Sequence, residues 1–203
     1  MNNPANKTTP GTLRSTGKLL LAFLATTLLN ADAELLVLPL PDGETMEFVE
    51  VQVSTDQTLF PLHQFKIGDR ASGVWQEYPT DVGLGGAFLL GQSKESRWVY
   101  YMGKTEVSEA AYHALMPGSP APSDGKLPAR NIPWIEVQQF INNYNLWLYK
   151  EAREKIPASG DRLGYLRLPT ESEWEFAARG GLSVAPARFD EKHPYGPALS
   201  KHE

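Results

Sequence analysis

Residues 166–181 read LRLPTESEWEFAARGG, and this stretch contains signals for both ends of a short helix. Pro169 disfavours helix before it, and Thr170 can cap free amide groups with its hydroxyl. Glu173 stands three residues after Thr170, which completes a capping box, and Gly180 can adopt the left-handed conformation that ends a helix. The stretch therefore predicts a helix that begins directly after the threonine and stops before the glycine.

The residue types within this predicted helix also follow a pattern. Glu171 lies in the first turn, where the helix dipole favours an anion, and Glu175 and Arg179 form an i,i+4 pair. Trp174 and the alanines three and four residues later share one apolar face. We expect the helix to dock on the core through this face. A tryptophan flanked by acids and an arginine also suits the lining of a peptide groove, and the sequence leaves both readings open.

The stretch closely resembles the RLPTE-x-EWE-x-AARGG signature of the formylglycine-generating enzyme family, also called the sulfatase-modifying-factor domain. Three earlier stretches resemble other segments of that family in the same order: GGAFLLG at 85–91, GKTEVSEAAY at 103–112 and IPWIEVQQFINNY at 132–144. Residues 40–48 are similar to the opening of its periplasmic, non-sulfatase branch. The chain departs from the family pattern at Thr105, Ser108, Pro133 and Val137.

The resemblance implies an α+β fold of the C-type-lectin-like kind that is poor in regular secondary structure. It also implies that the chain covers only the N-terminal part of the family's domain, so we expect a truncated domain. The signature positions, which we expect to be structural or groove-lining, are Arg167, Pro169, Thr170, Glu171, Glu173, Trp174, Glu175, Arg179 and Gly180.

Composition limits the function. The 203 residues are 41% hydrophobic and 21% charged, which is typical of a soluble globular domain with a sizeable core. A formal net charge of -5 provides no basic surface, so we expect no nucleic-acid partner. The chain has no cysteine, which excludes disulfides, thiolate metal sites and a cysteine nucleophile.

The resemblance associates copper and calcium with relatives, and the active ones bind copper through two C-terminal cysteines. Those ligands are not present in this chain, so no catalytic residue is carried over and the cofactor stays unassigned. The four histidines do not show the spacing of a metal motif. A site made from His193, His202 and Glu203 is an alternative to three solvated side chains.

The N-terminus has the order of a signal peptide. Lys7, Arg14 and Lys18 precede an apolar run over residues 19–29, and small residues then lead to Ala33. The apolar run is about half the roughly twenty residues that a spanning helix needs. We therefore expect residues 1–33 to be removed on export to the periplasm or outside the cell, which leaves no stable membrane span. The alternatives are an uncleaved anchor and a buried helix.

The remaining chain divides at about residue 80. Residues 34–80 predict an N-terminal β-segment, with a hairpin at 36–53 that turns at residues 41–43 and a further strand within 60–67. Residues 81–203 form the N-terminal part of the formylglycine-generating-enzyme-like domain. In it we predict strands at 87–90, 98–102 and 165–168, helices at 109–116 and 134–151, a loop at 117–131, and turns at Gly83, Gly85, Gly86 and Gly91.

Periodicity assigns the buried face of the longer helix. Apolar residues recur there at helical spacing, so they belong to the core. The face consists of Trp134, Val137, Phe140, Ile141, Tyr144 and Leu148.

Two functions from different classes fit these observations. The favoured one is an exported sulfatase-modifying-factor-like domain that acts as a non-catalytic binding or regulatory module in the cell envelope, with an envelope protein or peptide as its partner. The alternative is a metal-dependent oxidoreductase of the formylglycine-generating family whose active-site half lies beyond residue 203.

Overall fold

The computed structural model describes residues 35–55, 61–68, 79–92 and 95–189. These residues lie in one compact unit. The predicted signal peptide and the proposed metal ligands at the C-terminus lie outside the described residues. The strands are β1 (Leu35–Pro39), β2 (Thr45–Ser54), β3 (Leu62–Ile67), β4 (Thr80–Gly85), β5 (Phe88–Leu90), β6 (Arg97–Gly103), β7 (Ala158–Ser159) and β8 (Arg162–Leu163). The helices are α1 (Glu109–Leu115), α2 (Trp134–Glu151), α3 (Glu171–Ala178) and α4 (Pro186–Phe189), with short 3-10 turns at Pro41–Gly43, Arg153–Lys155 and Gly181–Ser183.

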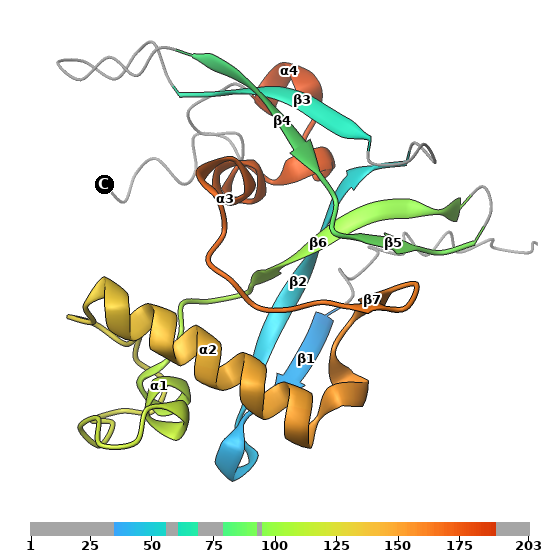
Figure 1. Cartoon of the computed structure of the whole chain (residues 1–203). Helices are drawn as coiled ribbons and strands as arrows, with labels where there is room; N and C mark the ends of the chain where they lie inside the picture. The colour runs from blue at the N-terminus through green and yellow to red at the C-terminus, as the bar shows by residue number, and fades with distance from the viewer. Residues whose placement is uncertain (1–34, 56–60, 69–78, 93–94, 190–203) are drawn as a thin grey trace, which may run out of the picture. The chain divides into compact units, whose positions relative to one another are not determined.

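Three antiparallel sheets combine with these helices, so the fold is α+β as expected. The main sheet has the order β1-β2-β6-β5, and the pairs β3-β4 and β7-β8 form two smaller sheets. Figure 1 shows β2 running beside β6, and it shows α1 lying next to α2. In the register of the main sheet, Phe48 lies opposite Gly103 and Val51 opposite Tyr100.

The predicted hairpin is confirmed. Strands β1 and β2 pair from Leu35 opposite Val49 to Pro39 opposite Thr45. The turn between them places Asp42 at φ 68° and Gly43 at φ 85°, in the left-handed region that aspartate and glycine tolerate. Local turn chemistry therefore fixes this register.

The strands predicted at 60–67, 87–90 and 98–102 correspond to β3, β5 and β6. The turns predicted at Gly83 and Gly85 are wrong, because both residues lie in β4 and pair with β3. Glycine has no side chain, so these residues interrupt the alternation of apolar and polar side chains that indicates a strand. Gly86 serves close packing, since an added Cβ would lie 2.7–2.9 Å from atoms of Trp98 and Val99. Gly91 is a turn residue at φ 82°, as predicted.

The strand predicted at 165–168 is also wrong, because this segment has no strand neighbour. The side chain of Asn145 in α2 makes the hydrogen bonds that a neighbouring strand would make. Leu166 N donates to Asn145 Oδ1 over 2.7 Å, and Asn145 Nδ2 donates to Leu166 O over 2.8 Å. Hydrogen bonds to helix α2, and not pairing with a neighbouring strand, therefore hold this segment.

One core cluster joins the hairpin to α1 and α2. Ser108 caps α1, since its hydroxyl accepts a hydrogen bond from Ala111 N. On α2 the buried stripe is Phe140, Tyr144 and Leu148, but Trp134 is 68% exposed and does not belong to it. Trp134 is the first residue of α2, and the stripe begins six residues later. The cluster consists of Leu38, Leu40, Phe48, Ala111, Tyr112, Leu115, Phe140, Tyr144, Leu148 and Ala152.

A second cluster joins the sheet to β3, β4 and α3, and strand β2 contributes to both clusters. Its members are Val53, Phe65, Leu84, Tyr100, Phe176 and Phe189. Among the described helices, none combines the length and the apolar character that crossing a membrane requires.

Candidate functional site

The capping box at the start of α3 is present as predicted. Glu173 N donates to Thr170 Oγ1 over 3.2 Å, and Thr170 N donates to Glu173 Oε2 over 2.8 Å. At the other end, Gly180 adopts the left-handed conformation, with φ 89°, and the helix ends before it. The local sequence alone positions both ends of α3.

Glu173 also holds Arg167 in a two-pronged ion pair. Arg167 Nη1 donates to Glu173 Oε2 over 2.7 Å and Arg167 Nη2 donates to Glu173 Oε1 over 2.5 Å. Burial alone raises the pKa of Glu173, but the hydrogen bonds from Arg167 and Thr170 and the charge of Arg167 outweigh it and hold that pKa below its usual value. A charged carboxylate is therefore stable here although Glu173 is only 7% exposed.

The apolar face predicted for α3 is wrong. Trp174 is 60% exposed, whereas Phe176 is fully buried. The ring of Phe176 packs 5.2 Å from that of Phe65 and 5.5 Å from that of Phe189, measured between centroids. The buried residues of α3 are thus Glu173 and Phe176, at i and i+3, and Arg167 neutralises the buried carboxylate.

The ion pair predicted between Glu175 and Arg179 is present and ties α3 to its neighbours. Gly68 N, at the end of β3, donates to Glu175 Oε1 over 3.2 Å. Arg179 Nη1 donates to Phe189 O over 3.2 Å, and the guanidinium lies 5.6 Å from the centroid of the Phe189 ring. These contacts connect α3 to the end of β3 and to α4.

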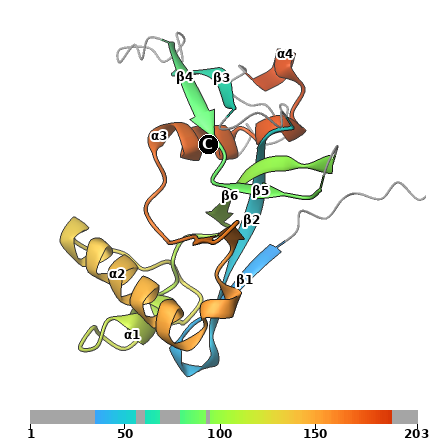
Figure 2. The same cartoon turned by 45° about the vertical axis from the view of Figure 1, so that its right-hand side comes forward.

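A cavity of about 730 Å³ lies beside the other half of the signature. Its walls come from the main sheet, the C-terminal part of α2, and the segment from Ile156 to Pro169 that leads to α3. Figures 1 and 2 show in orange the part of this segment that runs from β7 to α3. The apolar wall consists of Leu36, Leu38, Phe48, Ala87, Phe88, Trp98, Tyr101, Met102, Leu148, Ile156, Leu163 and Leu166.

The polar groups of the cavity are few. Arg167 and Glu173, which form the ion pair described above, line it, and Arg162 of β8 is the third charged residue of the lining. The hydroxyl of Tyr100 donates to Glu173 O over 2.7 Å, and burial raises the pKa of Tyr100, so this hydroxyl stays neutral. Apolar walls with a few fixed polar groups are typical of a ligand site.

The structure thus divides the predicted signature residues. Three of them line the cavity: Arg167, Pro169 and Glu173. The other predicted positions do not line it: Thr170, Glu171, Trp174, Glu175, Arg179 and Gly180. Sequence reasoning missed Arg162 and Asn145. Asn145 could have been noticed as a polar residue next to the buried stripe of α2, but nothing in the sequence marks Arg162.

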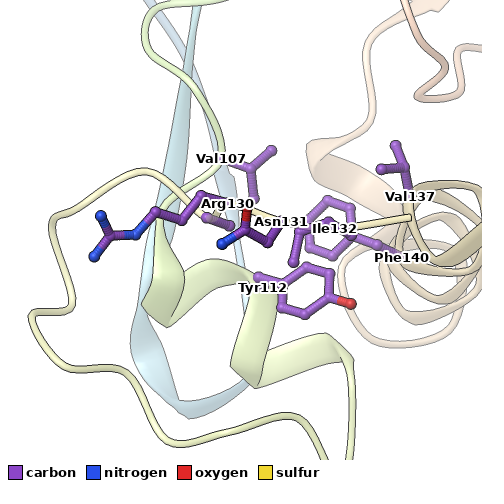
Figure 3. Close-up of a pocket in the computed structure, with 8 residues that line it drawn as sticks. Val107, Tyr112, Arg130, Asn131, Ile132, Val137 and Phe140 are labelled. Carbon is purple, nitrogen blue, oxygen red and sulfur yellow. The ribbon is translucent and has the colours of Figure 1, made fainter. Parts of the chain in front are cut away.

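A second, smaller hollow of about 300 Å³ lies between α1, α2 and the loop before α2. Figure 3 shows the rings of Tyr112 and Phe140 beside each other and the guanidinium of Arg130 directed away from them. The Tyr112 hydroxyl donates to Glu136 Oε2 over 2.7 Å, and burial with this hydrogen bond raises the pKa of Tyr112 to about 12. The hydroxyl of Tyr112 in this smaller hollow therefore connects α1 to α2. The larger cavity is the candidate site.

The residues present do not fit the metals that the resemblance associates with relatives. Copper(I) sites need soft ligands such as thiolates, and the chain has no cysteine. Calcium needs several oxygen ligands, and within the described ranges no group of three or more His, Asp or Glu residues is placed to hold a metal ion. His63 instead packs against Phe176, with 5.2 Å between ring centroids, and burial lowers its pKa.

A family model matches a large part of the chain. The family model described as sulfatase-modifying factor enzyme 1-like domain matches residues 80–202, which is more than half of the chain and includes the signature stretch. No curated protein and no solved structure matches.

Proposed function

The chain belongs to the family of sulfatase-modifying factor enzyme 1-like domains, and we propose that it acts as a non-catalytic binding or regulatory module of the cell envelope. Its partner is an envelope protein or peptide that places apolar side chains in the cavity beside α3. The observation that carries this proposal is the cavity itself, with its extensive apolar wall and few polar groups.

The size of the cavity supports this role. At about 730 Å³ it falls within the roughly 300–1,000 Å³ that is usual for ligand pockets. Tyr165 is 74% exposed and lines the cavity, so an external group has access to that side. No described residue in the cavity is a cysteine or histidine that could act as a nucleophile or metal ligand. The lining suits binding rather than group transfer.

Occupancy of the cavity can be tested with the neutral dye N-phenyl-1-naphthylamine, whose fluorescence rises in an apolar site. We expect saturable binding to the wild type. The variant Ala87→Trp adds an indole to the cavity wall and should abolish the signal. Leu146→Trp, on the exposed side of α2, is the matched control and should bind normally. Absence of saturable binding by the wild type, in a protein that still unfolds cooperatively, would refute the proposed function.

The absence of catalysis has a separate test. We expect no conversion of a cysteine-containing sulfatase peptide when copper is supplied, because capture of copper(I) needs soft ligands that the chain lacks. Mass spectrometry of the peptide detects the aldehyde product. Stoichiometric conversion would contradict the non-catalytic role and would show that a ligand set without cysteine can do this chemistry.

We propose export on the order of basic, apolar and small residues that ends at Ala33. The mature protein then begins at Glu34. Intact-mass measurement of the protein from its native host checks this prediction. Recovery of the full 203 residues from the cytoplasmic fraction would contradict it.

We also propose that the domain has the C-type-lectin-like arrangement, with residues 34–80 as an added β-segment and 81–203 as part of the shared domain. The support is an antiparallel sheet with two helices, α1 and α2, separated by a long irregular loop. A crystal structure of residues 34–203 tests this. A strand order that does not superpose on lectin-like domains would contradict it.

A further inference from the structure

We propose that the cavity recognises the free C-terminus of a partner polypeptide: an apolar last side chain enters the cavity, and its carboxylate binds Arg162. This inference rests on the proposed binding function and names the chemistry of its partner. Three observations carry it: the unbalanced charge of the cavity, its apolar depth, and the unpaired backbone along one side.

The charge of the cavity is one positive unit in excess. The charged residues in its lining are Arg162, Arg167 and Glu173. Glu173 is fully engaged with Arg167 and with the backbone of Thr170, so that pair is neutral as a whole. The guanidinium of Arg162 makes no ion pair or side-chain hydrogen bond within the described ranges. The cavity therefore has a place for one monoanion.

The apolar part selects what accompanies that anion. Phe88 and Tyr101 stand with ring centroids 5.6 Å apart, and both line the cavity together with Leu163. Burial of one large apolar side chain against such a wall is favourable, whereas a hydrophilic residue would lose its water without compensation. The ligand is thus an apolar group that carries a single negative charge.

The segment leading to α3 favours a polypeptide over a small acid. The peptide groups of Leu166 face α2, where Asn145 binds both the N–H and the C=O. In an extended chain the peptide groups of successive residues point to opposite sides, so those of Tyr165 and Arg167 face away from Asn145. Along the described chain these groups have no backbone hydrogen-bond partner. An extended peptide can add to them as a strand while its terminal carboxylate is captured nearby.

Matched peptides test each part. The probe is fluorescein-Gly-Ser-Gly-Ser-Leu-Phe with a free carboxylate, and fluorescence polarisation measures its binding to the protein. We expect the otherwise identical C-terminal amide to bind about tenfold more weakly, a difference of about 1.4 kcal/mol. A carboxylate peptide that ends in Gly-Ser should not bind measurably, because it leaves the apolar wall empty.

Variants connect these effects to residues. Arg162→Gln should weaken the acid peptide about tenfold and leave the amide unchanged, so that the two bind equally. Arg162→Lys keeps the charge and should retain most of the preference for the acid. Arg153→Gln is the matched control, since Arg153 stacks on Tyr149 outside the cavity and its loss should change neither peptide.

Each outcome decides a separate point. Equal binding of acid and amide by the wild type overturns the inference but leaves the proposed function intact if the neutral dye still binds. Binding of 2-naphthoic acid as tight as that of the peptide makes the ligand a small carboxylic acid and overturns it too. If the protein associates with itself and this association displaces the peptide, a second copy of the chain occupies the cavity, and the inference of a separate partner is overturned. Loss of dye and peptide binding together refutes the proposed function itself.

Discussion

The carboxylate of Glu173 has two tasks. It completes the cap of α3 through Thr170, and it neutralises Arg167 at the edge of the cavity. The ion pair with Arg167 requires the ionised form, and the hydrogen bonds from Arg167 and Thr170 together with the charge of Arg167 lower the pKa of Glu173 in the folded protein. A lowered folded pKa adds stability above the unfolded pKa, and this stability is lost as the pH falls through the folded value.

Glu173→Gln separates the two tasks, because glutamine also completes a capping box but carries no charge. We expect the variant to be about 1–3 kcal/mol less stable than the wild type at pH 7, and we expect the difference to shrink as the pH falls below 4.5, the ordinary pKa of a glutamate, towards the lowered pKa of Glu173. Urea unfolding at a series of pH values measures this. A difference that stays constant from pH 7 to pH 3 would show that the charge of Glu173 is not its source.

Trp174 and Phe176 are two aromatic residues of one helix with opposite environments. Phe176→Ala should cost about 3–5 kcal/mol, since it leaves a void among packed rings. Trp174→Ala should cost less than about 1 kcal/mol, since most of the side chain is exposed. Denaturant melts with unchanged m-values check both figures. A large loss for Trp174→Ala alone would mean that a surface covers this side chain in solution.

At the scale of the element, α3 is a short helix that depends on its ends. Eight residues are too few for a helix to be stable alone in water. The capping box, the left-handed Gly180 and the ties from Glu175 and Arg179 to neighbouring segments compensate for the short length. The position of α3 in turn fixes Arg167 and Glu173 in the wall of the cavity.

Thr170→Ala should therefore destabilise the protein by about 1 kcal/mol, because it leaves the amide of Glu173 without its cap. Thr170→Ser is the control and should be close to the wild type. Thermal unfolding of both variants measures the difference. Equal losses in the two variants would place the role of Thr170 in its methyl group and not in its hydroxyl.

At the scale of the whole molecule, the N-terminal β-segment and the family-matched region share one sheet and both cores. Strand β2 pairs with β6 across the boundary predicted at residue 80. Phe48 of β2 belongs to the cluster with α1 and α2, and Val53 of the same strand belongs to the cluster with α3. The two parts are therefore expected to fold together.

A fragment of residues 80–203 should consequently show no cooperative urea transition, whereas residues 34–203 should unfold cooperatively. Circular dichroism during urea titration distinguishes the two results. If the shorter fragment gave a sharp transition with a similar m-value, the family-matched region would be an independent folding unit.

The features predicted correctly from the sequence are those with local causes. The cap at Thr170, the stop at Gly180, the turn at Asp42 and Gly43, and the buried stripe of Phe140, Tyr144 and Leu148 each depend on residues a few positions apart. Family membership was also readable, because the signature stretch is long and specific.

Tertiary structure decided everything that depends on which side of an element meets the core. Helical spacing predicted Trp174 as the buried aromatic residue of α3, but Phe176 is buried instead, where it packs against the distant Phe65 and Phe189. The segment 165–168 has no strand neighbour, and the side chain of Asn145 in α2, 21 residues earlier than Leu166, binds the N–H and the C=O of Leu166. The cavity and the charge of Arg162 arise only where the sheet, α2 and this segment converge, since burial and charge balance are set by neighbours that lie far apart in the chain.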